Sequence, residues 1–328
     1  MPGGLRATKT TVLAVGVAML FALPAQASAS APVRATRPAR AQVWLHLPNA
    51  FFVDRQAVTV PGRVVDVVGG EWPYQTGQWV KLRAYLGRRL IGSGAFPLRR
   101  QGEYGEFRAA IASPASGNVA ITVTHVGTTR LAAFRVRRGV ETLDTNVGFG
   151  ATGRLIGLIQ RQLAALHFYV PQTGVYDQGT GLALDAYHRL LRWGTLQTLD
   201  ARTITALLDG YGAFKVRFPS HGRHAEGNLS VQLLALVDGS RVDAIYPISS
   251  GKPSTPTILG DFHVYSKVPG YLPDGMYDSN FFIRGYAIHG YDPAPDYPAS
   301  HGCMRLPIVD AASVYGWLRV GDWVDTYY

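Results

Sequence analysis

Cysteine is nearly absent from this sequence, since Cys303 is the only one among 328 residues. A disulfide within one chain is therefore excluded, and stable domains must rest on packed apolar cores. Hydrophobic residues make up 47% of the chain, which is enough for such cores, and the length suggests two or three domains. The 37 glycines and 20 prolines favour many turns and short strands over long helices.

Acidic residues are also scarce. Asp and Glu number 22 against 32 Lys and Arg, and the formal net charge is +10. An anionic partner such as nucleic acid or a cell envelope would fit this charge, and so would a basic surface that contacts only solvent. The sequence lacks both a dense Lys/Arg run with interleaved aromatics and any zinc-finger spacing, so we expect no nucleic-acid partner.

No hydrophobic run approaches the roughly 20 residues that a membrane-spanning helix needs. The apolar run from Val12 to Leu23 follows a basic stretch and precedes Ala-Gln-Ala at 25–27, which predicts a secretory signal peptide over residues 1–27. Cleavage after residue 29 fits the same rule, and an uncleaved membrane anchor is the alternative. We expect a mature protein outside the cytoplasm with no membrane span, in which the lone thiol of Cys303 is a candidate reactive group.

The first part of the mature chain is expected to be β-rich. Residues 28–41 are rich in Ala, Pro and Arg and are interpreted as a linker. Residues 42–138 show short apolar or alternating stretches separated by Gly, Pro and Ser, which predicts an all-β, sandwich-like accessory domain. Its two histidines, His46 and His125, are isolated, so no catalytic site is expected there.

The hydrophobic period changes to that of helices over residues 148–212. Apolar residues recur three and four apart from Leu155 to Leu166, and two more helices are expected near 182–191 and 203–208. A Gly-x-Gly-x-x-Gly stretch at 148–153 lacks the preceding strand of a dinucleotide site and is interpreted as a turn into the first helix. With Gly174-Val175-Tyr176-Asp177 between its first two helices, this small all-α domain resembles a three-helix peptidoglycan-binding module, although Tyr187-His188 stands where that family usually has Phe-Gln.

Residues 214–328 return to β character and form the expected third domain. Its first strand is expected at 214–218, its last at 323–327, and one helix at 309–318. The domain holds the strongest motif of the chain, Tyr286-Ala287-Ile288-His289-Gly290 followed by Ser300-His301-Gly302-Cys303-Met304-Arg305.

The motif combines the groups that acyl transfer needs. A thiol with an ordinary pKa of about 8.5 is mostly protonated at neutral pH, so Cys303 requires a neighbouring base. His289 or His301 can take its proton. Gly290 and Gly302 allow close approach of backbone N–H groups, which can stabilise an oxyanion.

These residues resemble the signature of the YkuD-type L,D-transpeptidases, a His-Gly pair followed by Ser/Thr-His-Gly-Cys, a hydrophobic residue and Asn or Arg. Upstream, Ser249-Ser250-Gly251-Lys252 and Thr255-Pro256-Thr257 resemble that family's substrate-side strand and turn. The resemblance covers residues 214–328 and implies a mainly-β catalytic domain that acts on peptidoglycan stem peptides outside the cytoplasm, at the bacterial cell wall.

The resemblance also implies a role for each residue of the motif. Cys303 matches the nucleophile and His289 the general base, whereas His301 flanks the nucleophile. Backbone groups of Gly302 and Cys303 match the oxyanion hole, and Gly290 matches the residue whose carbonyl orients the histidine. Arg305 matches the residue that fixes the substrate or a loop, and Ser300 and Tyr286 are the further expected substrate contacts.

The implied reaction requires neither a metal nor a cofactor. Cys303 attacks a donor stem peptide, D-Ala leaves, and an amine of a second stem resolves the thioester into a 3→3 cross-link. Two alternatives stay open: an L,D-carboxypeptidase, in which water resolves the same thioester, and a wall-binding protein without activity. His221 and His224 have only Glu226 near them in the sequence, too few ligands for an expected metal site. The sequence makes no prediction of the oligomeric state.

Overall fold

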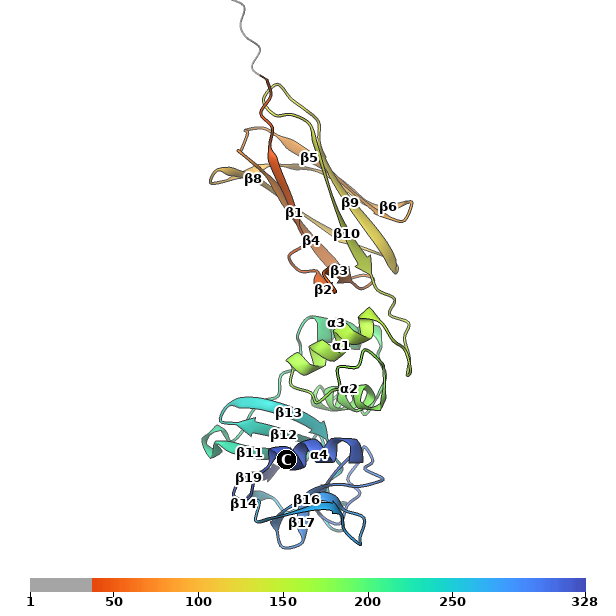
Figure 1. Cartoon of the computed structure of the whole chain (residues 1–328), viewed down its shortest axis with the longest axis vertical. Coiled ribbons are helices and arrows are strands. Elements are labelled where there is room, and N and C mark those ends of the chain that lie inside the picture. Colours follow the sequence, from red (N-terminus) through yellow and green to blue (C-terminus); the bar gives the residue numbers. More distant parts are fainter. Residues whose placement is uncertain (1–36) are drawn as a thin grey trace, which may run out of the picture. The chain divides into compact units, whose positions relative to one another are not determined.

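The computed structural model describes residues 37–328 (Figure 1). The predicted signal peptide and most of the predicted linker lie outside these residues. Within the described part, no helix has both the length and the apolar character to cross a membrane.

Ten strands between residues 42 and 142 form two sheets, with the strand orders β1-β4-β8-β7 and β2-β3-β10-β9-β5-β6 (Figure 1). Side chains alternate between core and solvent, as in β4, where Val65 and Val67 are buried and Asp66 between them is exposed. The predicted N-terminal β-rich region is thus confirmed. The bounds are β1 Gln42–His46, β2 Phe51–Val53, β3 Gln56–Thr59, β4 Val64–Trp72, β5 Trp79–Leu86, β6 Arg89–Pro97, β7 Arg99–Gln101, β8 Tyr104–Ala112, β9 Gly117–His125 and β10 Phe134–Thr142.

Three helices follow, α1 (Arg154–Ala165), α2 (Gln178–Leu190) and α3 (Ala201–Leu208). Aspartates start the second and third: Asp177 accepts a hydrogen bond from the Thr180 N–H at 2.9 Å, and Asp200 accepts one from the Thr203 N–H at 2.7 Å. Gly153, the last glycine of the Gly-x-Gly-x-x-Gly stretch, directly precedes α1, as the interpretation of that stretch as a helix-entry turn requires.

The helices share their apolar core with the strands that follow. Leu158 of α1 and Leu184 of α2 belong to one buried cluster with Leu233 of β12 (Leu233–Asp238) and Ile245 of β13 (Arg241–Pro247). In addition, Arg189 of α2 is buried and donates to the carbonyl oxygens of Gln232, directly before β12, and Ile248, directly after β13. A self-contained all-α domain is therefore not clearly shown, because periodicity predicts an apolar helix face but not its packing partner.

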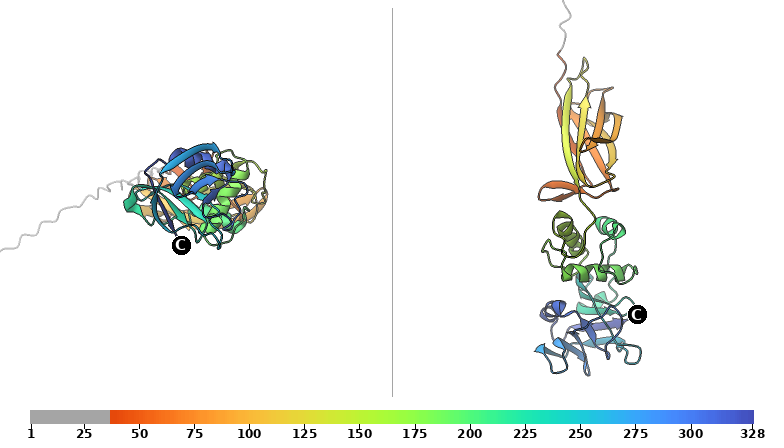
Figure 2. Two further views of the ribbon diagram at one scale, coloured as in Figure 1. Left: turned by 90° about the horizontal axis from the view of Figure 1, so that it is seen from below. Right: turned by 90° about the vertical axis from the view of Figure 1, so that its right-hand side faces the viewer.

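The C-terminal region consists of two sheets and a helix, α4 (Figure 2). The sheets have the orders β13-β12-β11-β19-β14 and β15-β16-β17-β18. Leu236 of the first sheet, Ile288 of the second and Val314 of α4 share one buried core, so the predicted mainly-β C-terminal domain is confirmed. The bounds are β11 Arg223–Asn228, β12 Leu233–Asp238, β13 Arg241–Pro247, β14 Gly260–His263, β15 Ser266–Tyr271, β16 Tyr277–Ile283, β17 Tyr286–Gly290, β18 Met304–Leu306, α4 Ile308–Trp317 and β19 Trp323–Tyr327, with a short 3-10 helix, η1, at Pro219–His221.

One predicted strand of this region is wrong. Residues 214–218 form no strand, because the N–H groups of Arg217 and Phe218 donate to the buried carboxylate of Glu226, each at 2.8 Å. The Glu226 side chain thus accepts hydrogen bonds that a neighbouring strand would accept in a sheet.

Candidate active site

Two parallel strands bring the thiol and the imidazole of the motif into one place. In the register of β17 and β18, Ile288 pairs with Met304 and His289 with Arg305. Cys303 directly precedes β18, and its sulfur accepts a hydrogen bond from the Ala287 N–H of β17 at 3.4 Å. A long-range strand pairing, not the short loop between the motifs, therefore sets the position of the nucleophile.

A cavity of about 450 Å³ opens at this point. Six of the residues that the sequence predicted for the site lie around it: Tyr286, His289, Ser300, His301, Cys303 and Arg305. The sequence analysis did not identify Asp274, Met276, Arg284 or Gly285, which line the cavity together with Tyr291. Arg284 and Gly285 form the turn between β16 and β17, which the sequence analysis did not predict. Gly285 is the signal in the sequence that could have revealed the turn.

The hydrogen bonds and burial of His289 favour one neutral tautomer. Its Nδ1–H donates to the carbonyl oxygen of Gly290 at 2.8 Å, which leaves Nε2 as the proton acceptor. Burial is the main cause that lowers the pKa of His289 to about 4; the positive charge of Arg305 adds to the effect, and the Gly290 bond opposes it. The side chain is 2% exposed, so at neutral pH it is an uncharged base.

Cys303 is also uncharged at rest. Burial raises the pKa of its thiol, and the Ala287 N–H and the charge of Arg305 offset only part of that effect. The thiol points toward the carbonyl oxygen of Gly285, at 3.8 Å. A neutral thiol and a neutral imidazole line the same cavity, and this pair suits proton transfer during nucleophilic attack rather than a preformed ion pair.

Ser300 holds the loop that carries the nucleophile. Its hydroxyl donates to the carbonyl oxygen of Cys303 at 2.6 Å and accepts from the Gly302 N–H at 3.0 Å. The residue is 1% exposed. In this structure the Ser300 hydroxyl and the Gly302 N–H, predicted to contact the substrate and the oxyanion, both form hydrogen bonds within the loop, and those two roles stay predictions. Within residues 37–328, the Cys303 N–H makes no hydrogen bond and stays available.

Glycine is required at position 302. Its φ of +119° lies in the region that side chains disfavour, and a Cβ there would collide with the ring of Tyr286. Tyr286 thus packs directly over the loop of the nucleophile. At Gly290, a Cβ would lie 2.7 Å from that of Ala311, so glycine there permits α4 to approach β17.

His301 and Arg305 lie at the rim of the cavity. His301 is exposed, and its Nε2 lies 3.2 Å from Nζ of Lys252, which belongs to the segment assigned to the substrate side of the motif. The guanidinium of Arg305 lies over the ring of Tyr291, 4.0 Å from its centroid. Both side chains are accessible at the cavity, whereas His289 is almost fully buried on the strand next to that of the thiol.

Comparisons with known proteins agree with this geometry. Residues 222–325 match the family model of the L,D-transpeptidase catalytic domain, YkuD. The chain is similar to the crystal structure of an L,D-transpeptidase from Xylanimonas cellulosilytica, with 28% identity and a TM-score of 0.51 over 56% of this chain and 98% of that one.

Two further structures also resemble the chain. One is an L,D-transpeptidase from Stackebrandtia nassauensis, with 18% identity and a TM-score of 0.36 over 56% of this chain and 96% of that one. The other is the catalytic domain of the L,D-transpeptidase from E. faecium, with 25% identity and a TM-score of 0.30 over 33% and 98%. No match was found among curated proteins. Residues 222–325 of this chain form an L,D-transpeptidase catalytic domain of the YkuD family.

Proposed function

We propose that this chain is an exported L,D-transpeptidase that forms 3→3 peptidoglycan cross-links through a thioester on Cys303. The observation that carries the proposal is that the thiol and His289 line the same cavity of a YkuD domain, and that the Gly290 bond at Nδ1 leaves Nε2 of His289 as the proton acceptor. Intact Cys303 and His289 argue against the alternative of an inactive wall-binding protein.

The first step forms the acyl-enzyme. Cys303 Sγ attacks the carbonyl carbon of the third residue of a donor stem while Nε2 of His289 takes the thiol proton. The negative charge that develops on the carbonyl oxygen is stabilised by the Cys303 N–H, a backbone donor of this loop that makes no hydrogen bond among the described residues. His289 then gives its proton to the nitrogen of the departing D-Ala, the peptide bond breaks, and a thioester remains.

The second step consumes the thioester. An acceptor amine attacks the carbonyl carbon, His289 takes a proton from that amine, and the proton passes to the departing Cys303 sulfur. A cross-link forms and the thiol is restored. If water attacks instead, the product is a shortened stem, and the enzyme is the L,D-carboxypeptidase of the alternative reading. No metal or cofactor is required for either outcome.

Intact-protein mass spectrometry with a carbapenem tests the nucleophile, because the family resemblance implies that such compounds acylate it. We expect one adduct on the wild type and none on Cys303→Ala. The matched control is Ser279→Ala, a small buried hydroxyl residue outside the cavity. An adduct on Cys303→Ala, or none on a folded wild type, would contradict the thioester mechanism.

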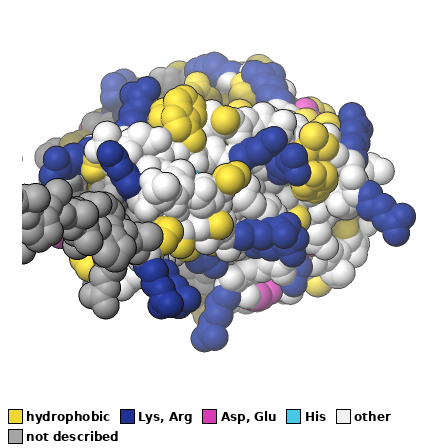
Figure 3. Space-filling view, turned by 90° about the horizontal axis from the view of Figure 1, so that it is seen from above, with side chains coloured by type: hydrophobic (Ala, Val, Ile, Leu, Met, Phe, Trp, Pro, Cys, Tyr) yellow, Lys and Arg dark blue, Asp and Glu magenta, His cyan; other side chains and the backbone are white. Residues whose placement is uncertain are grey.

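We also propose that the upstream regions keep the enzyme on the wall. For the segment with α1 to α3, the basis of this proposed role is its resemblance to a peptidoglycan-binding module. The exposed face of the sheet around β9 adds positive charge: Arg135 and Lys81 both pair with Thr124, and Arg137 and Arg83 both pair with Thr122. Figure 3 shows basic side chains spread over the face on view with few acidic ones.

The salt dependence of binding distinguishes adhesion by the helical segment from adhesion by the basic face. Attraction by exposed charge weakens steeply with salt, because the Debye length falls from about 10 Å at 0.1 M to about 3 Å at 1 M. The full chain should cosediment with insoluble wall, and part of this binding should persist at 1 M salt. The Arg135→Gln/Arg137→Gln variant should lose only the part of the binding that is sensitive to salt. The full chain is required because the helices share their core with β12 and β13. Complete loss of binding at high salt would remove the helical module from the proposal.

A further inference from the structure

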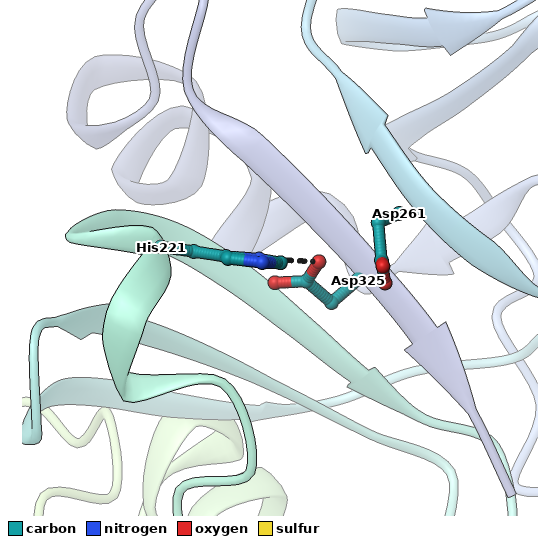
Figure 4. Close-up of side chains that lie close together, drawn as sticks. All are labelled: His221, Asp261 and Asp325. Carbon is teal, nitrogen blue, oxygen red and sulfur yellow. Dashed lines mark hydrogen bonds and ion pairs between the residues drawn. The ribbon is translucent and has the colours of Figure 1, made fainter.

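Three side chains that are far apart in the sequence meet on one face of the sheet β13-β12-β11-β19-β14. His221 ends η1, Asp261 lies on β14 and Asp325 lies on β19 (Figure 4). One potential ligand atom of each, a ring nitrogen or a carboxylate oxygen, lies within 4.8 Å of those of the other two. None of the three residues lines the cavity around Cys303, so the cluster is separate from the active site.

The register of the two strands makes the acidic pair unfavourable by itself. Asp261 and Asp325 are direct partners in the antiparallel ladder of β14 and β19, so their side chains leave the same face of the sheet. Like charges in directly opposed positions destabilise a sheet. A positive charge between them would turn this repulsion into attraction.

The buried carboxylate lacks a hydrogen-bond partner. The Asp325 side chain is fully buried, and its Oδ1 accepts from Nδ1 of His221 at 3.0 Å. Its Oδ2 is buried without any hydrogen-bond partner among the described residues. A buried carboxylate oxygen without a donor is costly unless it coordinates a cation. Figure 4 shows the carboxylate of Asp325 directed at the His221 ring.

The histidine is held in place for coordination. Its ring stacks on Trp323 at 4.5 Å between centroids and on Phe218 at 5.5 Å, with interplanar angles of 22° and 21°. His224, the nearby histidine that the sequence grouped with His221, cannot join the site, because its ring nitrogens lie 2.7 Å from the Gly222 carbonyl and 3.1 Å from Glu226. The site therefore offers one nitrogen and two carboxylates, with the exposed Asp261 on the solvent side.

We propose that His221, Asp261 and Asp325 bind a divalent transition-metal ion, for which zinc is the probe. Imidazole with carboxylate ligands suits zinc or a neighbouring first-row metal better than magnesium or calcium, which prefer oxygen alone. Ligand distances of about 2.0–2.2 Å place tetrahedral donors about 3.3 Å apart, so the three atoms close in slightly on binding, and water completes the coordination. The ion joins the segment before β11 to β14 and β19, and its role is to stabilise the domain rather than to take part in catalysis.

The experiment uses the full chain without an affinity tag, in the Cys303→Ser background, so that the catalytic thiol cannot bind zinc. Metal-free protein is titrated with zinc in competition with a chromogenic chelator, and its melting temperature is recorded with and without zinc. We expect one bound ion and a melting temperature that rises by several degrees, because a ligand that binds only the folded state stabilises it. The Asp261→Asn variant, which changes an exposed side chain, should bind zinc at least tenfold more weakly.

Asp238→Asn is the matched control, because Asp238 is an exposed residue of the same domain and its carboxylate forms an ion pair with Arg241. It should bind zinc as the parent does. Absence of saturable binding, or equal affinity in Asp261→Asn and the parent, would overturn the proposal. A titration with manganese in place of zinc distinguishes a site selective for zinc from one that takes several divalent metals, and both outcomes support the assignment of the three ligands.

Discussion

Gln232 and Ser250 exchange two hydrogen bonds, each of 2.8 Å: the Gln232 amide donates to the Ser250 hydroxyl, and the Ser250 N–H donates to the Gln232 side-chain oxygen. The Ser250 carbonyl in turn accepts the Ser300 N–H at 3.0 Å, and Ser300 holds the loop of Cys303. Arg189 of α2 donates to the main-chain carbonyl of Gln232 at 3.1 Å. A continuous set of hydrogen bonds thus runs from α2 to the nucleophile.

Gln232→Met tests whether these bonds position the nucleophile. Methionine keeps the approximate size of the side chain but leaves the buried Ser250 N–H and hydroxyl without these partners, which costs about 1–3 kcal/mol of folding stability. We expect slower acylation of Cys303 as well, by up to about 100-fold, since small displacements of reacting groups are costly. The acylation rate is measured by mass spectrometry well below the melting temperature. Gln101→Met, at an exposed position of β7, is the control. An unchanged rate in a destabilised variant would limit Gln232 to a structural role.

Gly302→Ala should abolish acylation. The alanine would have to adopt a φ of +119° and its Cβ would meet the Tyr286 ring, so the loop must shift and carry Cys303 with it. Gly316→Ala in α4 is the matched control, because a Cβ there meets nothing within 4 Å. Since glycine is unfavourable within helices, this control should gain about 0.5–1 kcal/mol of stability. Thermal melts and acylation rates of both variants give the comparison, and a fully active Gly302→Ala would show that the loop tolerates the shift.

The acylation rate should depend on pH as expected for a histidine whose pKa is lowered. The pKa of His289 is lowered to about 4 by burial, whereas a histidine in an unfolded chain has one of about 6.5. The folded enzyme therefore keeps its base down to about pH 5, and the acylation rate at fixed ionic strength should show no decline near pH 6.5. A decline centred there would assign the base to an exposed histidine instead.

The same shift has a consequence for stability. Between about pH 6.5 and 4, the unfolded chain binds a proton at His289 that the folded protein does not bind, so the contribution of this residue to stability falls as the pH falls through that window. Denaturant unfolding of the wild type should therefore lose more free energy between pH 7 and 5 than unfolding of His289→Gln. Equal losses would mean that His289 titrates alike in both states.

His289→Ala and His301→Ala should differ strongly in acylation. Removal of a general base costs about 10²–10⁴ in rate, and His289 is the histidine beside the thiol's strand. His301 is exposed and contacts Lys252, so its loss should change the Michaelis constant more than the maximal rate. Steady-state kinetics of both variants with a tetrapeptide stem provide the measurement. Equal maximal rates for His289→Ala and the wild type would exclude His289 as the base.

Features that depend on neighbouring residues were predictable from the sequence. The strands with alternating valines, the helix face from Leu155 and the motif around Cys303 are all short patterns whose physical cause is local. Features that depend on distant partners were not. Residues 214–218 form no strand because the Glu226 carboxylate accepts the N–H groups of Arg217 and Phe218. The helices share their core with β12 and β13. The cluster of His221 with Asp261 and Asp325 exists only because β14 pairs with β19.

The last prediction separates transfer from hydrolysis. We expect cross-linked dimer to exceed free tripeptide once the acceptor stem is abundant. Aromatic and proline side chains gather along residues 286–298, and Tyr286 and Tyr291 line the cavity that would hold the thioester. The Arg305 guanidinium lies over the Tyr291 ring, and we expect this contact to hold the ring in place as a barrier to water.

The competition is decided by acceptor positioning. Water is present at about 55 M, whereas well-positioned reactants can reach effective molarities of about 10⁵ M or more, so a bound acceptor wins if the cavity orients its amine. The measurement is a time course with tetrapeptide donor at rising acceptor concentration, with dimer and tripeptide resolved by chromatography. Tyr291→Ala, which removes the aromatic ring under Arg305, should shift the products toward tripeptide, and Tyr104→Ala on the β-rich region should not. Tripeptide as the sole wild-type product at saturating acceptor would make the enzyme a carboxypeptidase, because the thioester would then be open to water even when an amine is at hand.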